Sequence, residues 1–350
     1  MPRALLKVVS ADSEECKKIV SVWNRTLVQS WILVKFDRMQ ETTAKADLFN
    51  PGAAENFFDI SGLPHFAPGA NRAFHQGNAL WLAEFSRLIY RQDRTEKKSA
   101  RITSRTELLA AQEWEEMAFI QVQSVEAAIF RSHALSAAVL VFRGTLGIGD
   151  TLTDMNALMS DWRGVGKIHC GFRKDIDRVW PLLVEKLKHL DLPIFITGHS
   201  LGGALATLAA ALLRNEPRLP QPAAVYTFGS PRVGDREFAE SLHDLFHCRV
   251  VNGHDVVPKV PLPFSMKPFP VYQHTGELHR MLADGKLSVS PFGSDFLEDS
   301  DKELGMRDFL QRTAAFLKGS LTAGERISQA FLDHAPVNYI ARLERLQVVI

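Results

Sequence analysis

LPIFITGHSLGGALA, residues 192–206, joins a short apolar run to an alanine-rich segment through a turn centred on Ser200. The apolar run predicts a strand, and the alanine-rich segment predicts a helix. A serine at the tip of so sharp a turn has a strained backbone, so the residues two before and two after it must lack bulk, as Gly198 and Gly202 do. The G-x-S-x-G pattern therefore predicts a nucleophile elbow at Ser200. The alternative is a glycine-rich turn that carries an incidental serine.

A serine hydroxyl is a weak nucleophile near neutral pH, so Ser200 needs a histidine base and an acid that orients the base. After an elbow of this kind the partners follow in the order Ser, Asp or Glu, His. The sequence at 249–252 predicts a short strand that leads into Gly253, His254 and Asp255. Asp255 therefore stands at the C-terminal end of a strand, where open α/β sheets bind their ligands. His254 is a poor partner for it, because neighbouring residues on an extended chain point apart.

Three of the twelve histidines follow Asp255, namely His274, His279 and His334. We expect His274 in a strand and His279 at the start of a helical segment. His334 precedes Ala335-Pro336, which indicates a loop. The loop context favours His334 as the base and leaves His274 and His279 as alternatives.

Several separate stretches resemble the class 3 lipases, the fungal-type triacylglycerol lipase family of α/β-hydrolases. They are a strand and oxyanion loop at 138–145, Asp154, the H-x-G-F marker at 169–172, the elbow GHSLGG at 198–203, the turn at 227–234, the acid loop at 252–258, the strand at 272–276 and Asp333-His334. Together they span roughly 78–339 in the family's order. The resemblance implies an α/β-hydrolase fold, with a mostly parallel central sheet flanked by helices.

The resemblance also implies the chemistry: a serine carboxylic-ester hydrolase, a lipase or esterase, that acts on hydrophobic acyl esters such as acylglycerols through an acyl-enzyme intermediate. It makes Ser200 the nucleophile, Asp255 the orienting acid and His334 the base. The oxyanion hole is expected from the backbone N–H of Leu201 together with the N–H and hydroxyl of Thr145. No cofactor and no metal are implied. The expected partner is a hydrophobic ester or lipid substrate, met at a lipid interface.

Two features depart from the family pattern. The stretch after Thr145, at 146–152, carries two glycines and no aromatic residue, which disfavours the family's usual helical lid. An extra block at about 284–323 precedes His334 and is expected to cover the site as a lid in place of that helix. Its apolar side chains would line an acyl groove while its acids, Asp295 among them, face water; the alternative is a surface elaboration away from the site.

Composition sets wider bounds. The chain has 41 basic and 40 acidic side chains, which argues against a nucleic-acid partner. Three widely spaced cysteines imply no disulfide framework and fit a reducing compartment. The N-terminus has no apolar segment of signal-peptide length, and no stretch is long and apolar enough to be a transmembrane segment. We therefore expect a cytoplasmic protein, with signal-independent secretion left open. The oligomeric state is not predicted.

The pattern along the chain predicts a two-part organisation. Residues 1–75 are expected to form an N-terminal extension packed on the core, and residues 76–350 the α/β-hydrolase domain, with the insertion at about 284–323. Alternating segments predict strands and helices of a parallel sheet. The expected helices are 79–90, 174–188, 203–214 and 237–246, and the expected strands include 119–123, 127–131, 139–142 and 224–228.

Other interpretations remain open. His243 and His247 stand four apart on an expected helix beside Cys248, a spacing that suits a shared metal, but no third ligand is evident and a solvated helix face is favoured. The same triad also suits an acyltransferase or a phospholipase. A catalytically inactive lipid-binding protein on the hydrolase scaffold is the third alternative.

Overall fold

The computed structural model describes residues 51–53, 56–59, 62–91, 103–144, 158–261, 271–295 and 329–347. All of them belong to the second of two compact units, Glu41–Ile350. The predicted N-terminal extension lies mostly outside the described residues, so its role stays a prediction. Among the described helices, none is both long and apolar enough to cross a bilayer.

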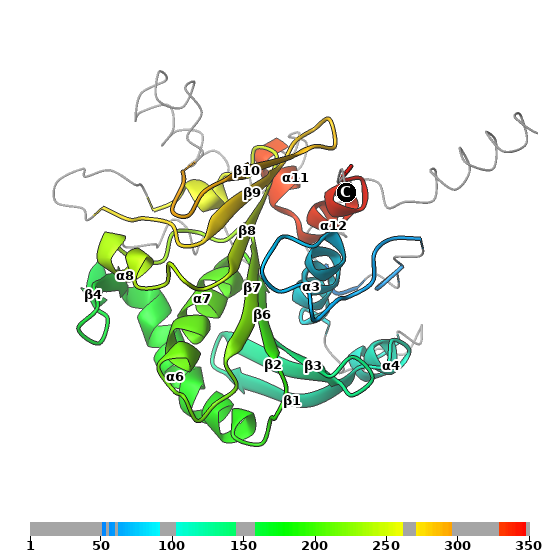
Figure 1. Cartoon of the computed structure of the whole chain (residues 1–350), viewed down its shortest axis with the longest axis horizontal. Coiled ribbons are helices and arrows are strands. Elements are labelled where there is room, and N and C mark those ends of the chain that lie inside the picture. The colour runs from blue at the N-terminus through cyan, green and yellow to red at the C-terminus, as the bar shows by residue number, and fades with distance from the viewer. Residues whose placement is uncertain are drawn as a thin grey trace, which may run out of the picture. The chain divides into compact units, whose positions relative to one another are not determined.

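An eight-stranded sheet forms the centre of this unit, in the order β1-β2-β3-β6-β7-β8-β9-β10 (Figure 1). The strands from β3 to β9 run parallel, whereas β1, β2 and β10 are antiparallel to their neighbours. Their bounds are β1 Glu115–Val122, β2 Val125–Ser132, β3 Ala137–Phe142, β6 Ile194–His199, β7 Pro222–Phe228, β8 His247–Asn252, β9 Glu277–Met281 and β10 Leu287–Ser290. The predicted mostly parallel sheet is confirmed.

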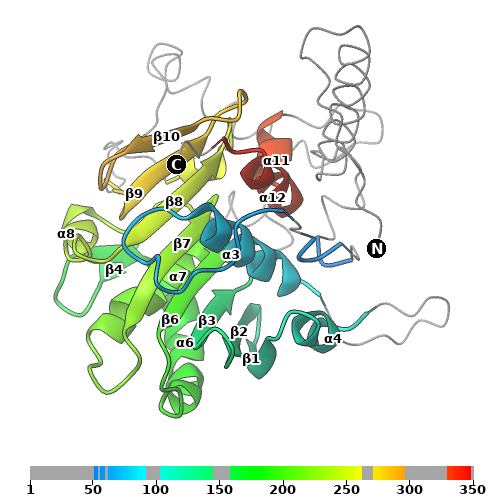
Figure 2. The same ribbon diagram turned by 45° about the vertical axis from the view of Figure 1, so that its right-hand side comes forward.

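Helices cover both faces of the sheet (Figure 2). On one face α7 (Leu201–Arg214) packs on β6 and β7, and α6 (Cys170–Leu187) packs on α7 and β1. On the other face α3 (Gln76–Leu88) packs on β6 and on α12 (Pro336–Glu344). The smaller elements are α4 Arg105–Ala110, β4 Met159–Asp161, β5 Lys167–His169, α8 Arg236–Glu240, the 3-10 turn η1 Val257–Lys259 and α11 Gln329–His334.

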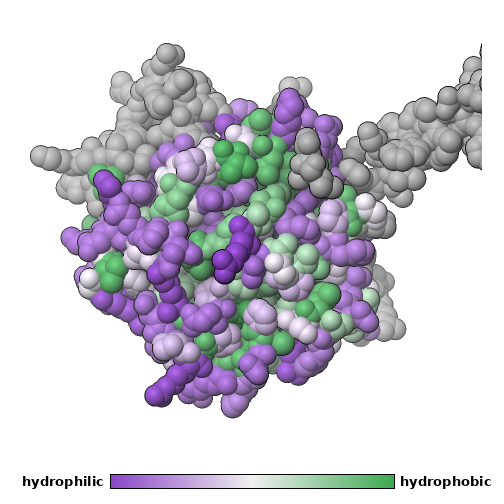
Figure 3. All heavy atoms as spheres, viewed as in Figure 1, coloured by the Kyte–Doolittle hydropathy of each residue, from purple (hydrophilic) through white to green (hydrophobic). Residues whose placement is uncertain are grey.

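The two faces are packed differently. Helix α7 is buried over nearly its whole length, because its alanines let it lie close to the sheet. The opposite face carries an aromatic cluster in which Phe66 contacts Trp81, Trp114 and Phe195 edge to face. Phe66 belongs to the loop before α3, so this loop is anchored to the core. On the surface seen in Figure 3, hydrophilic and hydrophobic residues are interspersed.

Three helices lie close to their expected positions, at α3, α6 and α7. The helix expected at 237–246 is wrong in its second half, because α8 ends at Glu240 and β8 begins at His247. The helical segment expected at His279 is also wrong. His279 lies in β9, which is hydrogen-bonded to β8 on one side and to β10 on the other. Buried and accessible residues do not alternate along β9, so the two-residue period that marks a strand is missing from its sequence. In the described stretch that begins at residue 271, the strand expected around His274 is reduced to one bridge, between Gln273 and Gly234.

Candidate active site

Ser200 lies at the turn between β6 and α7, in the backbone geometry that the G-x-S-x-G pattern predicts. Its φ of 58° and ψ of −128° are strained for a residue with a side chain. A Cβ on Gly198 would meet the carbonyl carbon of Gly202 at 2.3 Å, and one on Gly202 would meet the Phe142 oxygen at 2.2 Å. Only glycine therefore fits on either side of the serine.

The elbow is held by the neighbouring strands and opens a helix. The N–H of Ser200 donates to the Phe228 carbonyl at the end of β7. Leu201 is the first residue of α7, so its N–H belongs to the first turn and has no acceptor within the helix. Helix N-termini favour negative charge, which is the environment that a developing oxyanion needs. The second predicted donor, Thr145, lies outside the described residues, as does Asp154.

Asp255 and His334 form a buried pair. The Nδ1 of His334 lies 2.8 Å from Asp255 Oδ2 and 3.0 Å from Oδ1, and both side chains are almost inaccessible. Because the carboxylate accepts from Nδ1, Nε2 is the nitrogen that can take up a proton. Asp255 follows β8, as the sequence predicts. His334 is the last residue of α11 rather than part of a loop, and Ala335 and Pro336 end that helix and begin α12.

Two further donors orient the Asp255 carboxylate. The N–H of Val257 donates to Oδ1 at 2.9 Å, and the hydroxyl of Tyr339 donates to Oδ2 at 2.6 Å. Burial next to this carboxylate raises the pKa of Tyr339 well above its usual value, so the hydroxyl keeps its proton. Gly229 leaves room for the arrangement, since a Cβ there would meet Asp255 Oδ2 at 2.7 Å.

His199 connects the elbow to His334. Its Nε2 donates to the carbonyl oxygen of His334 at 2.6 Å, and the two rings lie 4.5 Å apart. Burial lowers the pKa of His199 well below its usual value, which keeps the ring neutral. Because His199 directly precedes Ser200, this bond ties the backbone of His334 to the elbow.

Asp333 fixes the acid loop from the other side. Its carboxylate accepts the N–H of His254 at 2.7 Å, and its carbonyl accepts the Asn252 side chain at 2.9 Å. No role is predicted from the sequence for Tyr339, His199 or Asp333. His199 and Asp333 directly precede Ser200 and His334, and this adjacency is the signal that could have pointed to them.

The alternative histidines lie elsewhere. His274 bonds through Nε2 to the Pro258 carbonyl, and His279 stacks on Phe74 with ring centroids 4.9 Å apart. His247 is buried in β8 between the hydroxyls of Thr227 and Thr275. With His247 in a strand, the helical spacing to His243 that a metal pair requires is absent. Among the described residues, no group of three or more His, Cys, Asp or Glu side chains is placed to hold a metal.

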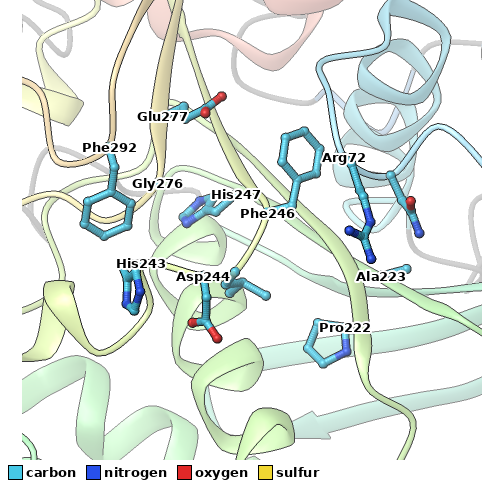
Figure 4. A pocket seen from close by; sticks show the side chains of 12 residues that line it. Arg72, Pro222, Ala223, His243, Asp244, Phe246, His247, Gly276, Glu277 and Phe292 are labelled. Carbon is cyan, nitrogen blue, oxygen red and sulfur yellow. The ribbon is translucent and has the colours of Figure 1, made fainter.

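A polar cavity of about 500 Å³ opens at the other end of the sheet (Figure 4). It lies where β7, β8 and β9 begin, whereas Ser200 and Asp255 follow the ends of β6 and β8. Arg72, His243, Asp244, Glu277 and Phe292 line it. The cavity is therefore separate from the candidate active site.

Only part of the block at 284–323 is described, namely residues 284–295. Val289 on the edge strand β10 is 57% exposed, and Phe292 lines the cavity away from Ser200. Asp295 was expected to face water, and it is exposed. Its carboxylate also pairs with the buried Arg232, because a buried guanidinium needs a carboxylate partner. The assignment of this block as a lid stays a prediction, and the stretch at 146–152 lies outside the described residues.

Known proteins carry the same pattern. Residues 139–265 match the family described as Lipase (class 3). A lipase of Rhizopus niveus is 39% identical over 145 residues, which are 38% of this chain and 37% of that protein. The chloroplastic phospholipase A1-Igamma2 of Arabidopsis thaliana is 36% identical over 169 residues, which are 42% of this chain and 30% of that protein. The chain thus spans about a third of the length of these two relatives.

A solved structure, that of a mutant form of MDLA from Penicillium cyclopium, is similar in fold, with a TM-score of 0.53 and 23% identity. The superposition covers 67% of this chain and 92% of that one. The family match includes the elbow at Ser200 and the acid loop at Asp255, and the fold around them is that of an α/β-hydrolase. Residues 139–265 of the chain thus match the class 3 lipase family.

Proposed function

We propose that this chain is a serine carboxylic-ester hydrolase, a lipase or esterase, that acts on hydrophobic acyl esters such as acylglycerols. The observation that carries the proposal is the buried Asp255–His334 pair, tied through His199 to a serine held at a positive φ. The match of residues 139–265 to the class 3 lipase family and the similarity to the lipase of Rhizopus niveus support it.

In this mechanism the Ser200 hydroxyl attacks the ester carbonyl carbon while Nε2 of His334 takes the hydroxyl proton. The tetrahedral oxyanion accepts the N–H of Leu201 and the donors of Thr145, and each such donor is worth about a hundredfold to a thousandfold in rate. The intermediate then expels the alcohol, which takes the proton from His334. Water attacks the acyl-enzyme in the same way and releases the carboxylic acid and free Ser200.

The test is hydrolysis of p-nitrophenyl esters of graded chain length, with triolein alongside. We expect turnover by the wild-type chain and none by Ser200→Ala. Ser132→Ala is the matched control, because it removes another buried hydroxyl, at the end of β2. A wild-type chain that cleaves none of these esters, or a Ser200→Ala variant that keeps a substantial part of the rate, would refute the proposal.

A phospholipase is the second candidate, favoured by the similarity to phospholipase A1-Igamma2. The two substrate classes are separated by offering dioleoyl phosphatidylcholine and triolein at equal concentration. Preferential release of fatty acid from the phospholipid would assign the chain to the second class.

Contact with a lipid interface is part of the proposal. Leu158 and Val271 are large apolar residues that are 55% and 46% exposed. The hydroxyl of Tyr272, the residue after Val271, donates to the Leu158 carbonyl and so links the two segments. A rate that rises when the substrate concentration passes its solubility limit would support the contact. A cytoplasmic location remains a prediction, which cell fractionation would check.

A further inference from the structure

Gly144 lies against the nucleophile elbow. It follows β3, and it directly precedes Thr145, the predicted oxyanion residue. A Cβ on Gly144 would meet the His199 carbonyl oxygen at 2.7 Å and the Ser200 Cβ at 3.3 Å. The chain that leads into the oxyanion loop is therefore in close contact with the elbow at its last described residue.

The side chain of Tyr90 reaches Gly144 from the end of α3. A Cβ on Gly144 would lie 2.5 Å from the Tyr90 hydroxyl oxygen, and that oxygen accepts a hydrogen bond from the Gly144 N–H. Tyr90 is 7% exposed. Burial raises the pKa of this phenol, so it is a neutral hydroxyl at every pH at which the protein would act. The contact links residues 54 positions apart in the sequence, counted from 90 to 144.

Arg143 holds the same segment from the other side. Its guanidinium lies over the Tyr90 ring, 5.3 Å from the centroid, and pairs with Glu126 on β2. The N–H of Arg143 donates to the Glu126 carbonyl at 3.0 Å. The ion pair is nearly buried, with side chains 13% and 8% exposed. The residue before Gly144 is thus fixed to the sheet, and the tyrosine fixes Gly144 itself.

We propose that the Tyr90 hydroxyl is a positioning group for ester hydrolysis, because it holds Gly144, the residue before Thr145, against Ser200. This inference rests on the proposed function. The strand end alone would not need this contact, since Phe142 is already paired with Gly198 on β6. Oxyanion donors act within about 2.7–3.1 Å, and a misplacement of about 1 Å costs as much as a hundredfold in rate.

The experiment compares Tyr90→Phe with wild type in the full chain. Phenylalanine keeps the ring under Arg143 and removes only the hydroxyl. Tyr226→Phe is the matched control, because Tyr226 is another buried tyrosine whose hydroxyl bonds to backbone, at His75 and Ala73, but not at the elbow. The readouts are kcat and KM on a p-nitrophenyl ester, the affinity for an alkyl trifluoromethyl ketone that forms a tetrahedral adduct with Ser200, and the melting temperature.

We expect Tyr90→Phe to lower kcat about tenfold with KM within about twofold. The affinity for the ketone should fall by the same factor, because the adduct carries the oxyanion and the ground-state ester does not. Tyr226→Phe should leave the rate and the affinity for the ketone unchanged, while it lowers the melting temperature by about as much as Tyr90→Phe does. A merely structural role of Tyr90 would make the two variants alike.

Unchanged kcat and ketone affinity in Tyr90→Phe would overturn the inference, and so would an effect confined to KM. If this variant does not fold, Arg143→Lys replaces it. That variant keeps the charge opposite Glu126 but loses the planar group over Tyr90, and an unchanged kcat would again overturn the inference. Absence of any ester hydrolysis by wild type would instead refute the proposed function, and this inference with it.

Discussion

Replacing Tyr339 by phenylalanine removes one of the donors that hold the Asp255 carboxylate. The hydroxyl lies 2.6 Å from Oδ2, in a site that water does not reach. A hydrogen bond to a charged group contributes about 1.5–3 kcal/mol, against about 1 kcal/mol for one between neutral groups. The N–H of Val257 and Nδ1 of His334 remain as donors, so the carboxylate keeps part of the hydrogen bonding that stabilises its charge. We therefore expect the free energy of unfolding to fall by about 2 kcal/mol.

The same change should lower kcat about tenfold, because a carboxylate with fewer fixed donors orients His334 less well. Removing Asp255 itself should cost far more, in the range of about 10⁴ known for triad acids. Urea unfolding at pH 7 gives the stability, and hydrolysis of a p-nitrophenyl ester gives the rate. Tyr226→Phe, which loses a bond to neutral backbone groups, should cost about 1 kcal/mol and no rate. Equal losses of stability in the two variants, or an unimpaired kcat in Tyr339→Phe, would refute the reasoning.

Three further outcomes are expected. His334→Ala should be as inactive as Ser200→Ala, and the double variant little worse, since triad members act as a unit; initial rates check this, and an inactive His274→Ala beside an active His334→Ala would reassign the base. Burial lowers the pKa of His247 to about 3. The His247 ring of the unfolded chain takes up a proton below about pH 6.5, whereas the buried ring of the folded chain does so only near pH 3. The free energy of unfolding should therefore be unaffected by this group above about pH 6.5 and should fall as the pH drops toward 3. Urea midpoints at pH 7 and pH 5 measure this fall, and His247→Gln should reduce it. Gly202→Ala should prevent formation of the elbow, since its Cβ would meet the Phe142 oxygen at 2.2 Å; a fluorophosphonate probe that still labels Ser200 at the wild-type rate would contradict this.

The sequence predicts the parts of the site that depend on local backbone geometry. The elbow at Ser200 needs small residues at fixed offsets, and these are visible in the 15-residue stretch that contains it. The position of Asp255 follows from a strand that ends just before it, because ends of parallel strands meet at one edge of the sheet. In contrast, the short run around His279 fits a helix or a strand equally well. Hydrogen bonds to both neighbouring strands, β8 and β10, decide between them, and those partners are distant in sequence.

The positioning groups are the part that sequence reasoning could not supply. Tyr339 is 84 positions from Asp255 in the sequence. The residues around Tyr339 give no sign of whether its hydroxyl bonds to a carboxylate or to solvent. Tyr90 has the same property with respect to Gly144. In both cases the tyrosine sits at or next to a helix that packs on the face of the sheet opposite α7, and its hydroxyl reaches the edge where the strands end. The helices α3 and α12 therefore do more than cover the sheet, because the Tyr339 hydroxyl bonds to Asp255 and the Tyr90 hydroxyl lies against Gly144. A substitution that shifts either helix should then alter the rate before it unfolds the core.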